Sequence, residues 1–383
     1  MASGRAESTH TPIDREADAA MPLIPRTRTL GMVAAALALI VASSLAACGA
    51  STTPTSEAPA GGTRTVADMV GRQVQIPANV TRVATNIPLI PPMIYLLGGI
   101  SKLACAPTSS PSSLFESIDP AIKNIPTSAV ASINDEELLT LHPQVFIMTS
   151  LTQNLVPTLT RLGIPFVEVA AFDNPAQLEA GVNLVADVLG GSAPARAKQF
   201  DSYYDGNVKL VQAKTASLPN SSRPTVYYAP GPDPTTTVGS GNIITSSIDE
   251  AGGQNIAAVH GIGASQGGSF AFPTINAEDL IGWNPQVIVA ISAKIRQQFA
   301  SSPKYATLGA VRNHRFYSCP TGIFAWCASG PEAALQPLWI AKTLHPNLFP
   351  TLDLATEVKN FYSTFYAYHL SDQQTDAILN PVP

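Results

Sequence analysis

One pattern of fifteen residues occurs twice in this chain, 142 positions apart. Residues 133–147 read I-N-D-E-E-L-L-T-L-H-P-Q-V-F-I and residues 275–289 read I-N-A-E-D-L-I-G-W-N-P-Q-V-I-V, so that Pro143 aligns with Pro285 and seven positions are identical. In each copy a short apolar stripe precedes the proline and a run of apolar residues follows it. Because proline stops a helix and a β-branched apolar run favours a strand, each copy predicts a helix, a stop and a buried strand.

The start of each copy also carries helix signals. Asn134 and Asn276 are expected to cap the two helices, and Glu136 and Glu278 lie in the first turn, where the helix dipole favours a negative charge. The repeat distance is several times that of a solenoid, so it predicts two similar α/β lobes. Since clefts between lobes are common ligand sites, we expect a small ligand between them.

The N-terminus has the features of an export signal. Two arginines precede an uncharged stretch that ends L-A-A-C-G, with Cys48 directly after small residues. This order is typical of a secretory signal, and the cysteine resembles that of a bacterial lipoprotein box, where the sulfur is lipidated. We expect residues 1–47 to be a signal peptide, with Met21 as an alternative start, and residues 48–63 to be a flexible tether. A single transmembrane anchor is the alternative, because the run is close to the ~18 residues that can span a bilayer.

Charge and cysteine content indicate which binding partners, disulfides and metal sites to expect. The net charge is −5, only 13% of the 383 residues are charged, and no Lys/Arg cluster occurs, so nucleic acid is not an expected partner. In an exported protein a disulfide is permitted, and Cys319 and Cys327 are the expected pair, which leaves Cys105 as a buried thiol. Neither the cysteines nor the histidines show metal-ligand spacing, so we expect no metal held directly by side chains and no resident cofactor.

The order of elements predicts an α/β fold with two similar lobes, each around a mostly parallel sheet. We expect an N-terminal lobe over residues 64–192, one linking helix over residues 193–218 and a C-terminal lobe over residues 219–383. In the first lobe the expected strands are 82–85, 102–106, 145–148 and 165–169, and the expected helices are 91–97, 113–118, 135–141, 151–162 and 175–189.

Several motifs resemble a known family. The opening D-x-x-G-R-x-V-x-I-P at residues 68–77, the A-G-G-Q-N block at 251–255 and the stretch W-C-A-S-G-P-E-A-A-L-Q-P-L-W at 326–339 are similar to the helix-linked (class III) substrate-binding lipoproteins of ABC importers. These proteins serve uptake of ferric siderophores, haem and cobalamin. The resemblance implies a monomeric, extracytoplasmic protein, lipid-anchored to the bacterial cell membrane, that passes a metal chelate to a permease and its ATPase. The C-terminal stretch resembles a branch of the family that includes proteins assigned to iron complexes and some assigned to molybdate or tungstate, and such an oxoanion is the alternative ligand.

In open α/β lobes, ligands bind beyond the carboxyl ends of the strands, so the loops after each strand are the candidates. Hydroxyls and amides follow the strands of the first lobe and aromatic side chains follow those of the second, which suits a bulky, partly apolar chelate. The candidate ligand-binding residues are Asn86, Thr108, Ser109, Ser150, Tyr228, Phe270, Phe272 and Trp326.

Two further readings concern other surfaces and another class of protein. The resemblance implies acidic residues that dock on the permease, with Glu116, or Asp119 as its alternative, in the first lobe and Glu250 in the second as candidates. The run G-A-S-Q-G at 263–267 matches the G-x-S-x-G elbow of α/β-hydrolases, which makes an exported esterase using Ser265 the alternative class. The glycines before Ser265 and the proline at 273 disfavour the strand and helix that an elbow needs, so we expect a binding protein and no enzyme.

The signal predicts how the protein is anchored. Replacing Cys48 by Ser removes the sulfur that would be lipidated, so Cys48→Ser should leave the protein unacylated, and either released or unprocessed. Phase partitioning in detergent measures this. A mutant that enters the detergent phase as the parent does would contradict the lipidation.

Overall fold

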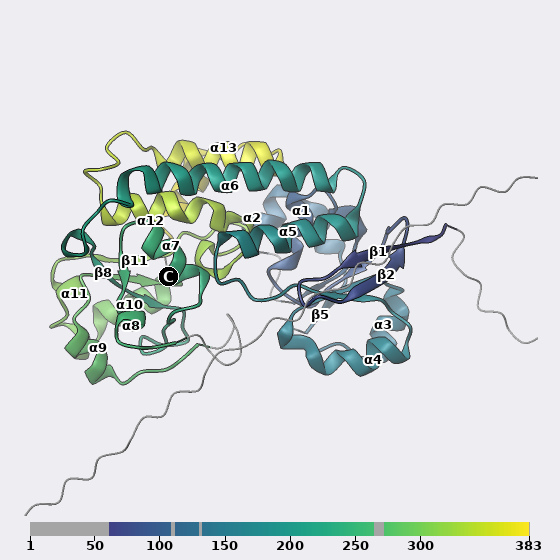
Figure 1. The fold of residues 1–383 in the computed structure, drawn as a ribbon, viewed down its shortest axis with the longest axis horizontal. Coiled ribbons are helices and arrows are strands. Elements are labelled where there is room, and N and C mark those ends of the chain that lie inside the picture. Colours follow the sequence, from purple (N-terminus) through teal and green to yellow (C-terminus); the bar gives the residue numbers. More distant parts are fainter. Residues whose placement is uncertain (1–60, 109–111, 130–131, 264–271, 383) are drawn as a thin grey trace, which may run out of the picture. The chain divides into compact units, whose positions relative to one another are not determined.

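The structure is a computed structural model that describes residues 61–108, 112–129, 132–263 and 272–382. Within these residues the chain forms two parallel sheets, each with its own set of helices, and a short antiparallel hairpin (Figure 1). The expected fold class, with two α/β lobes and one long helix between them, is confirmed.

The first lobe is built around a five-stranded parallel sheet with the strand order β5-β4-β3-β6-β7. Every residue of β4 and β6 is buried, as continuous apolar runs predict for parallel strands that are covered on both faces. The strands are β3 Val83–Ala84, β4 Leu103–Pro107, β5 Thr127–Ser128, β6 Val145–Met148 and β7 Phe166–Glu168, after the hairpin β1 Thr63–Ala67 and β2 Gln73–Pro77. The helices are α1 Ile90–Leu96, α2 Ser113–Ile118, α3 Asp135–Leu141, α4 Val156–Arg161 and α5 Pro175–Leu189, with the 3-10 helices η1 Ile100–Lys102, η2 Pro120–Asn124 and η3 Ser150–Leu155.

The second lobe contains a four-stranded parallel sheet with the order β11-β10-β8-β9. Its strands are β8 Thr225–Ala229, β9 Gln254–Asn255, β10 Val287–Ala290 and β11 Phe316–Ser318. Its helices are α7 Ile243–Glu250, α8 Ile256–Val259, α9 Ala277–Trp283, α10 Ala293–Ser301, α11 Gly309–Arg312, α12 Gln336–Leu344, α13 Leu354–Tyr366 and α14 Asp372–Leu379, with the 3-10 helices η4 Asn220–Ser222, η6 Pro303–Tyr305, η7 Trp326–Ala328 and η8 Pro331–Leu335.

The two copies of the sequence repeat fold into the same unit. Helix α3 leads into β6 and helix α9 leads into β10, and each helix ends on a left-handed residue directly before the proline, at His142 (φ 44°) and Asn284 (φ 46°). Asn134 caps α3 in a capping box with Glu137. The side chain of Asn276, by contrast, accepts no cap hydrogen bond in α9 among the described residues, so this expected cap does not form.

The glutamine that both copies share after the proline fixes a neighbouring strand. Gln144 Oε1 accepts from the backbone N–H groups of Thr81 (2.6 Å) and Arg82 (3.1 Å), directly before β3. Gln286 Oε1 accepts from the N–H of Thr225 at the start of β8 (2.9 Å). The repeat thus sets the register of the pairs β3–β6 and β8–β10, which explains why the glutamine recurs.

The helix between the two sheets is α6, Ala193–Thr215, which starts as expected and ends three residues before the expected boundary. Its 23 residues span about 35 Å at ~1.5 Å per residue. Figure 1 shows α6 running beside α12 and α13. The buried ring of Phe200 in α6 packs against that of Phe365 in α13, with the ring centroids 6.1 Å apart. Arg196 of α6 donates to the carbonyl oxygens of Leu96 in α1 (2.7 Å) and Phe365 (2.6 Å), so one guanidinium joins helices from both halves of the chain.

No helix in the described part of the chain combines the length and the apolar character needed to cross a bilayer.

These contacts predict a small closure on ligand binding. Because α6 is tied to α1 and to α13, little rotation between the sheets is possible without breaking partly buried hydrogen bonds. X-ray scattering profiles with and without ligand should nearly superpose. A large ligand-induced decrease in the radius of gyration would contradict this reading, and Arg196→Ala should make any closure larger.

Candidate functional site

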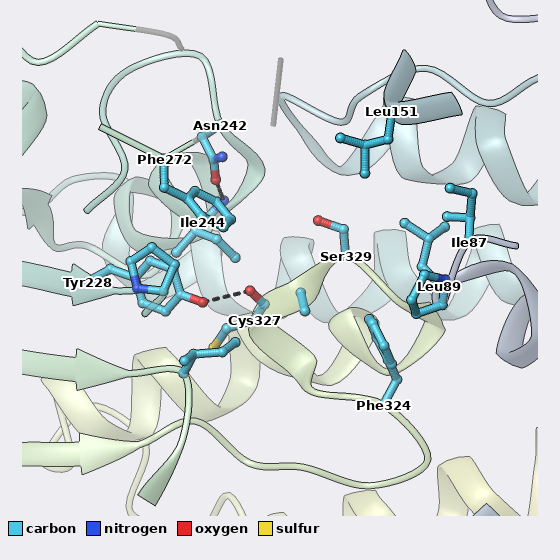
Figure 2. Close-up of a pocket in the computed structure, with 14 residues that line it drawn as sticks. Ile87, Leu89, Leu151, Tyr228, Asn242, Ile244, Phe272, Phe324, Cys327 and Ser329 are labelled. Carbon is cyan, nitrogen blue, oxygen red and sulfur yellow. Dashed lines mark hydrogen bonds between the residues drawn. The ribbon is translucent and has the colours of Figure 1, made fainter. Parts of the chain in front are cut away.

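A cavity of about 310 Å³ lies beyond the carboxyl ends of four strands, two from each sheet. Residues 87–89 follow β3, Leu151 follows β6, Pro230 follows β8 and Ile291 follows β10. These are the same strand pairs that the repeat places side by side, so the cavity is a direct product of the duplicated unit. The lining residues, most of them labelled in Figure 2, are Ile87, Pro88, Leu89, Leu151, Tyr228, Pro230, Asn242, Ile244, Phe272, Ile291, Phe324, Cys327, Ala328 and Ser329.

The lining is apolar and uncharged. Among the described residues that line it, none carries a charge, and the polar side chains other than Tyr228 and Cys327 are Asn242 and Ser329. Leu151 and Phe272 are 45% and 41% exposed, so they lie where the cavity meets solvent. Such a surface binds through burial of apolar area and aromatic contact, with few polar groups to orient the ligand.

Tyr228 presents its ring to the cavity and uses its hydroxyl internally. The hydroxyl donates to the carbonyl oxygen of Cys327 (2.8 Å), as the dashed line in Figure 2 shows, and the carbonyl of Tyr228 accepts from Thr237 Oγ1 (2.9 Å). Burial raises the pKa of Tyr228 far above its usual value, so this residue stays a neutral donor. A fixed, neutral aromatic face is therefore available to a ligand.

Cys327, whose carbonyl oxygen accepts the hydrogen bond from Tyr228, lies in a turn that is held by a disulfide. Cys327 is joined by a disulfide to Cys319, just past β11, and its N–H lies 3.1 Å from Cys319 Sγ. Two residues further on, Ser329 adopts a left-handed conformation (φ 64°) at the edge of the cavity. The staple thus fixes the segment 327–329 against the second sheet.

Phe324 reaches the cavity from a loop held by a buried carboxylate. Glu332 is fully buried, and its Oε2 accepts from the N–H of Phe324 (2.7 Å). Burial raises the pKa of Glu332 to about 7, while hydrogen bonds from Tyr362 and the loop act in the opposite direction. No described arginine, lysine or histidine forms an ion pair with it.

The structure places the expected site residues in three ways. Tyr228 and Phe272 line the cavity. Asn86, Thr108, Ser150 and Trp326 do not line it: Thr108 and Ser150 are exposed, and Asn86 and Trp326 are completely buried. Ser109 and Phe270 lie outside the described residues, as do Cys48 and Ser265.

Two of these buried residues carry unpaired polar atoms. The amide oxygen and nitrogen of Asn86, and Nε1 of Trp326, have no hydrogen-bond partner among the described residues. Each is the sequence neighbour of a lining residue, since Asn86 precedes Ile87 and Trp326 precedes Cys327. Contact between these two side chains and a ligand stays a prediction.

Several residues that line the cavity are not among those predicted from the sequence to bind the ligand. Asn242 and Ile244 belong to the first turn of α7, where Asn242 Oδ1 caps the helix by accepting from Ile244 N (2.9 Å). The G-S-G-N-I-I run at 239–244 signals this helix start, but the loop before it is too long to show which strand end it approaches. Ile291 and Leu151 each follow a strand by one to three residues, a position that the strand-end rule does identify.

The candidate permease-docking residues differ in exposure. Glu116 in α2 is partly exposed and pairs with Lys123 (3.3 Å). Glu250, at the end of α7, is half-buried, and its Oε2 has no partner among the described residues. Burial raises the pKa of Glu250 to about 7. Glu116 is the more accessible of the two.

Two parallel-sheet lobes joined by a long helix, with an apolar cavity at facing strand ends, define a two-lobed solute-binding protein of the helix-linked class. The chain belongs to the periplasmic binding protein family, whose model matches residues 92–321. This confirms the family that the sequence motifs resemble.

Known relatives agree with this class. The chain is 26% identical over 261 residues to the molybdate-binding protein MolA of Haemophilus influenzae, which covers 61% of this chain and 70% of the relative. The solved structure of MolA bound to molybdate superposes with a TM-score of 0.71 at 23% identity, covering 80% of this chain and 99% of MolA. A periplasmic solute binding protein from Veillonella parvula gives a TM-score of 0.69 at 25% identity, covering 83% and 97% of the two chains.

The disulfide predicts the stability of the cavity wall. Replacing both cysteines by serine in Cys319→Ser/Cys327→Ser should lower the free energy of unfolding by about 2 kcal/mol, because the staple limits the unfolded chain. Denaturant unfolding measures this loss. Cys105→Ser is the matched control for loss of a buried thiol. Free reactivity of Cys319 and Cys327 with an alkylating reagent in the native exported protein would contradict the pairing.

Proposed function

We propose that this protein is the ligand-capturing component of an ABC importer and that its ligand is a metal chelate with an apolar organic shell, such as a ferric siderophore, haem or a cobalamin. The observation that carries this proposal is the apolar, uncharged lining of the cavity between the lobes, with the rings of Tyr228, Phe272 and Phe324. An organic shell fits such a lining, since each buried square ångström of apolar surface contributes about 25 cal/mol.

The lining disfavours a bare metal ion. The described residues contain no group of three or more His, Cys, Asp or Glu side chains that is arranged to hold a metal. A chelate carries its own ligands, so the protein does not need to provide them. The volume of about 310 Å³ is at the lower end of ligand pockets, so a large chelate would extend across the half-exposed Leu151 and Phe272.

Molybdate or tungstate is the second candidate, and the sequence similarity to MolA favours it. The cavity offers an oxoanion the amide of Asn242, the hydroxyl of Ser329 and the N-terminal end of α7, where the helix dipole is positive. No described lining side chain supplies a positive charge, and burial of a dianion without a cation is costly. The lining therefore favours a neutral or apolar chelate over an oxoanion.

The remaining parts of the proposal concern place and partners. Lipidation of Cys48 would hold the protein at the outer face of the bacterial membrane, the tether 48–63 would let it reach a permease with its ATPase, and Glu116 would contribute to docking. The protein would act as a monomer. Membership in a family of binding proteins favours this role over hydrolysis at Ser265.

Titration of the purified protein separates the two ligand classes. We expect quenching of the fluorescence of its three tryptophans by ferric desferrioxamine B, haemin or cyanocobalamin, and no response to molybdate or tungstate. Tyr228→Ala and Phe324→Ala should weaken binding about tenfold or more, about 1.4 kcal/mol, because buried aromatic contacts dominate such sites. Tyr368→Ala, which removes an aromatic ring outside the cavity, is the matched control.

Two results would overturn the proposal. Binding of molybdate without binding of any chelate would assign the protein to the oxoanion branch. Unchanged affinity in both cavity variants would show that the ligand binds elsewhere.

A further inference from the structure

In the loop closed by the Cys319–Cys327 disulfide, the backbone N–H groups of Ile323 and Phe324 are held by one buried carboxylate, that of Glu332. Glu332 Oε1 accepts from Tyr362 Oη and from the N–H of Ile323 (3.3 Å), and Glu332 Oε2 accepts from the N–H of Phe324 (2.7 Å). Tyr362 Oη also accepts from the N–H of Ile323 (3.0 Å). A Cβ atom on Gly322 would collide with both Glu332 Oε1 and Tyr362 Oη, so the loop approaches the carboxylate as closely as glycine permits.

The surroundings of this carboxylate are neutral. Glu332 lies on η8, and the titratable groups that interact with it are Tyr362 and Tyr366, both completely or almost completely buried on α13. Asn207 of α6, which donates to η8 at Ala334, is uncharged, and so is Gln336 at the start of α12. The charge of the ionised form is therefore balanced by hydrogen-bond donors alone.

Protonation of Glu332 adds a hydrogen to a site that already receives three. The ionised carboxylate receives three hydrogens, one from Tyr362 and two from the loop. A protonated carboxyl adds a fourth, and Tyr362 Oη is the acceptor beside it, which would force the tyrosine hydrogen away from Glu332. Among the described hydrogen bonds, Glu332 Oε1 is the acceptor of the Tyr362 hydroxyl, so a displaced tyrosine hydrogen loses its partner unless the surrounding groups or the loop move.

We propose that Glu332 is the positioning residue of the ligand cavity: as a carboxylate it holds Gly322–Phe324 in the binding conformation, and its protonation releases this wall and weakens ligand binding. The link to ligand binding rests on the proposed function. The control of the loop by Glu332 is independent of the proposed function, because it is argued from the hydrogen bonds of Glu332 alone.

The proposal gives opposite pH trends for stability and affinity. The pKa of Glu332 is raised from 4.5 to about 7, so the native state binds the proton more tightly than the unfolded chain does. Its contribution therefore makes the fold less stable as pH rises from about 4.5 through about 7. Affinity moves the other way, since only the ionised form aligns Phe324. If Glu332 had only a structural role, ligand affinity would fall with rising pH, as the stability of the fold does.

The first test measures the stability of the loop's hydrogen bonds in the absence of ligand. Hydrogen exchange followed by NMR, from about pH 5.5 to about pH 8.5, gives the protection factors of the Ile323 and Phe324 amides after correction for intrinsic exchange. We expect about tenfold lower protection below the titration of Glu332, as for one lost buried hydrogen bond. Glu332→Gln should abolish this change. Glu179→Gln, which removes another glutamate with a pKa near 7 but lies on α5 away from the cavity, should retain it.

Tyr362→Phe is a second variant in case Glu332→Gln does not fold. The hydroxyl of Tyr362 lowers the pKa of Glu332, so its removal should move the midpoint of the protection change to higher pH. Protection that does not change with pH in the parent, or that still titrates in Glu332→Gln, would overturn the proposal. An unmoved midpoint in Tyr362→Phe would also overturn it.

The second test measures how ligand affinity depends on pH. Calorimetric titration with ferric desferrioxamine B should show about tenfold weaker affinity at about pH 5.5 than at about pH 8.5, and proton release on binding near pH 7, for a shift of about one pKa unit between the free and bound states. Glu332→Gln should show neither effect, and Glu179→Gln should show both. Affinity that falls as pH rises would contradict the proposal. If the siderophore binds at no pH, the chelate assignment fails and the exchange data still decide the role of Glu332.

Discussion

Parallel strand pairing is the constraint on which the rest of this structure depends. In each sheet all carboxyl ends lie on one edge, so the loops after β3 and β6 and those after β8 and β10 are gathered at two edges. The shared glutamines, Gln144 and Gln286, fix these pairs by bonding to the backbone before the adjacent strand. A cavity lined from four strand ends is the consequence, and a duplicated fifteen-residue pattern is its origin in the sequence.

Much of the fold is readable from the sequence because it depends on local chemistry. The bounds of α3, α5 and β6 match the expected ones, since capping residues, proline and β-branched runs determine where these elements begin and end. The expected helix 151–162 is instead a 3-10 turn, η3, followed by α4, with a non-helical Thr152 between them. The proline at 157 suits the first turn of a new helix better than the interior of a long one.

The site is less predictable, because its residues are brought together by tertiary contacts. The strand-end rule finds Tyr228 and the loop after β3, but it does not distinguish the exposed Thr108 and Ser150 from the lining Leu151 one position further on. Trp326 has the sequence context of a surface aromatic next to a cysteine, yet the disulfide turns the chain so that its ring is buried. Both a lining residue and its buried neighbour follow a strand end, so position in the sequence alone does not tell which of the two side chains faces the cavity.

The stiff connection between the lobes limits where the protein can adapt to a ligand. Arg196 ties α6 to α1 and α13, and the aromatic rings along α6 and α13 pack against each other, so closure by rotation would disturb many buried contacts at once. The loop that carries Phe324 is different: the Cys319–Cys327 disulfide closes it, and the N–H groups of Ile323 and Phe324 at its tip are held by hydrogen bonds to one carboxylate. Interactions of this kind are changed by a single proton, whereas packed rings are not. With the frame held by packed rings, the adjustment that we propose is local, at the wall that carries Phe324.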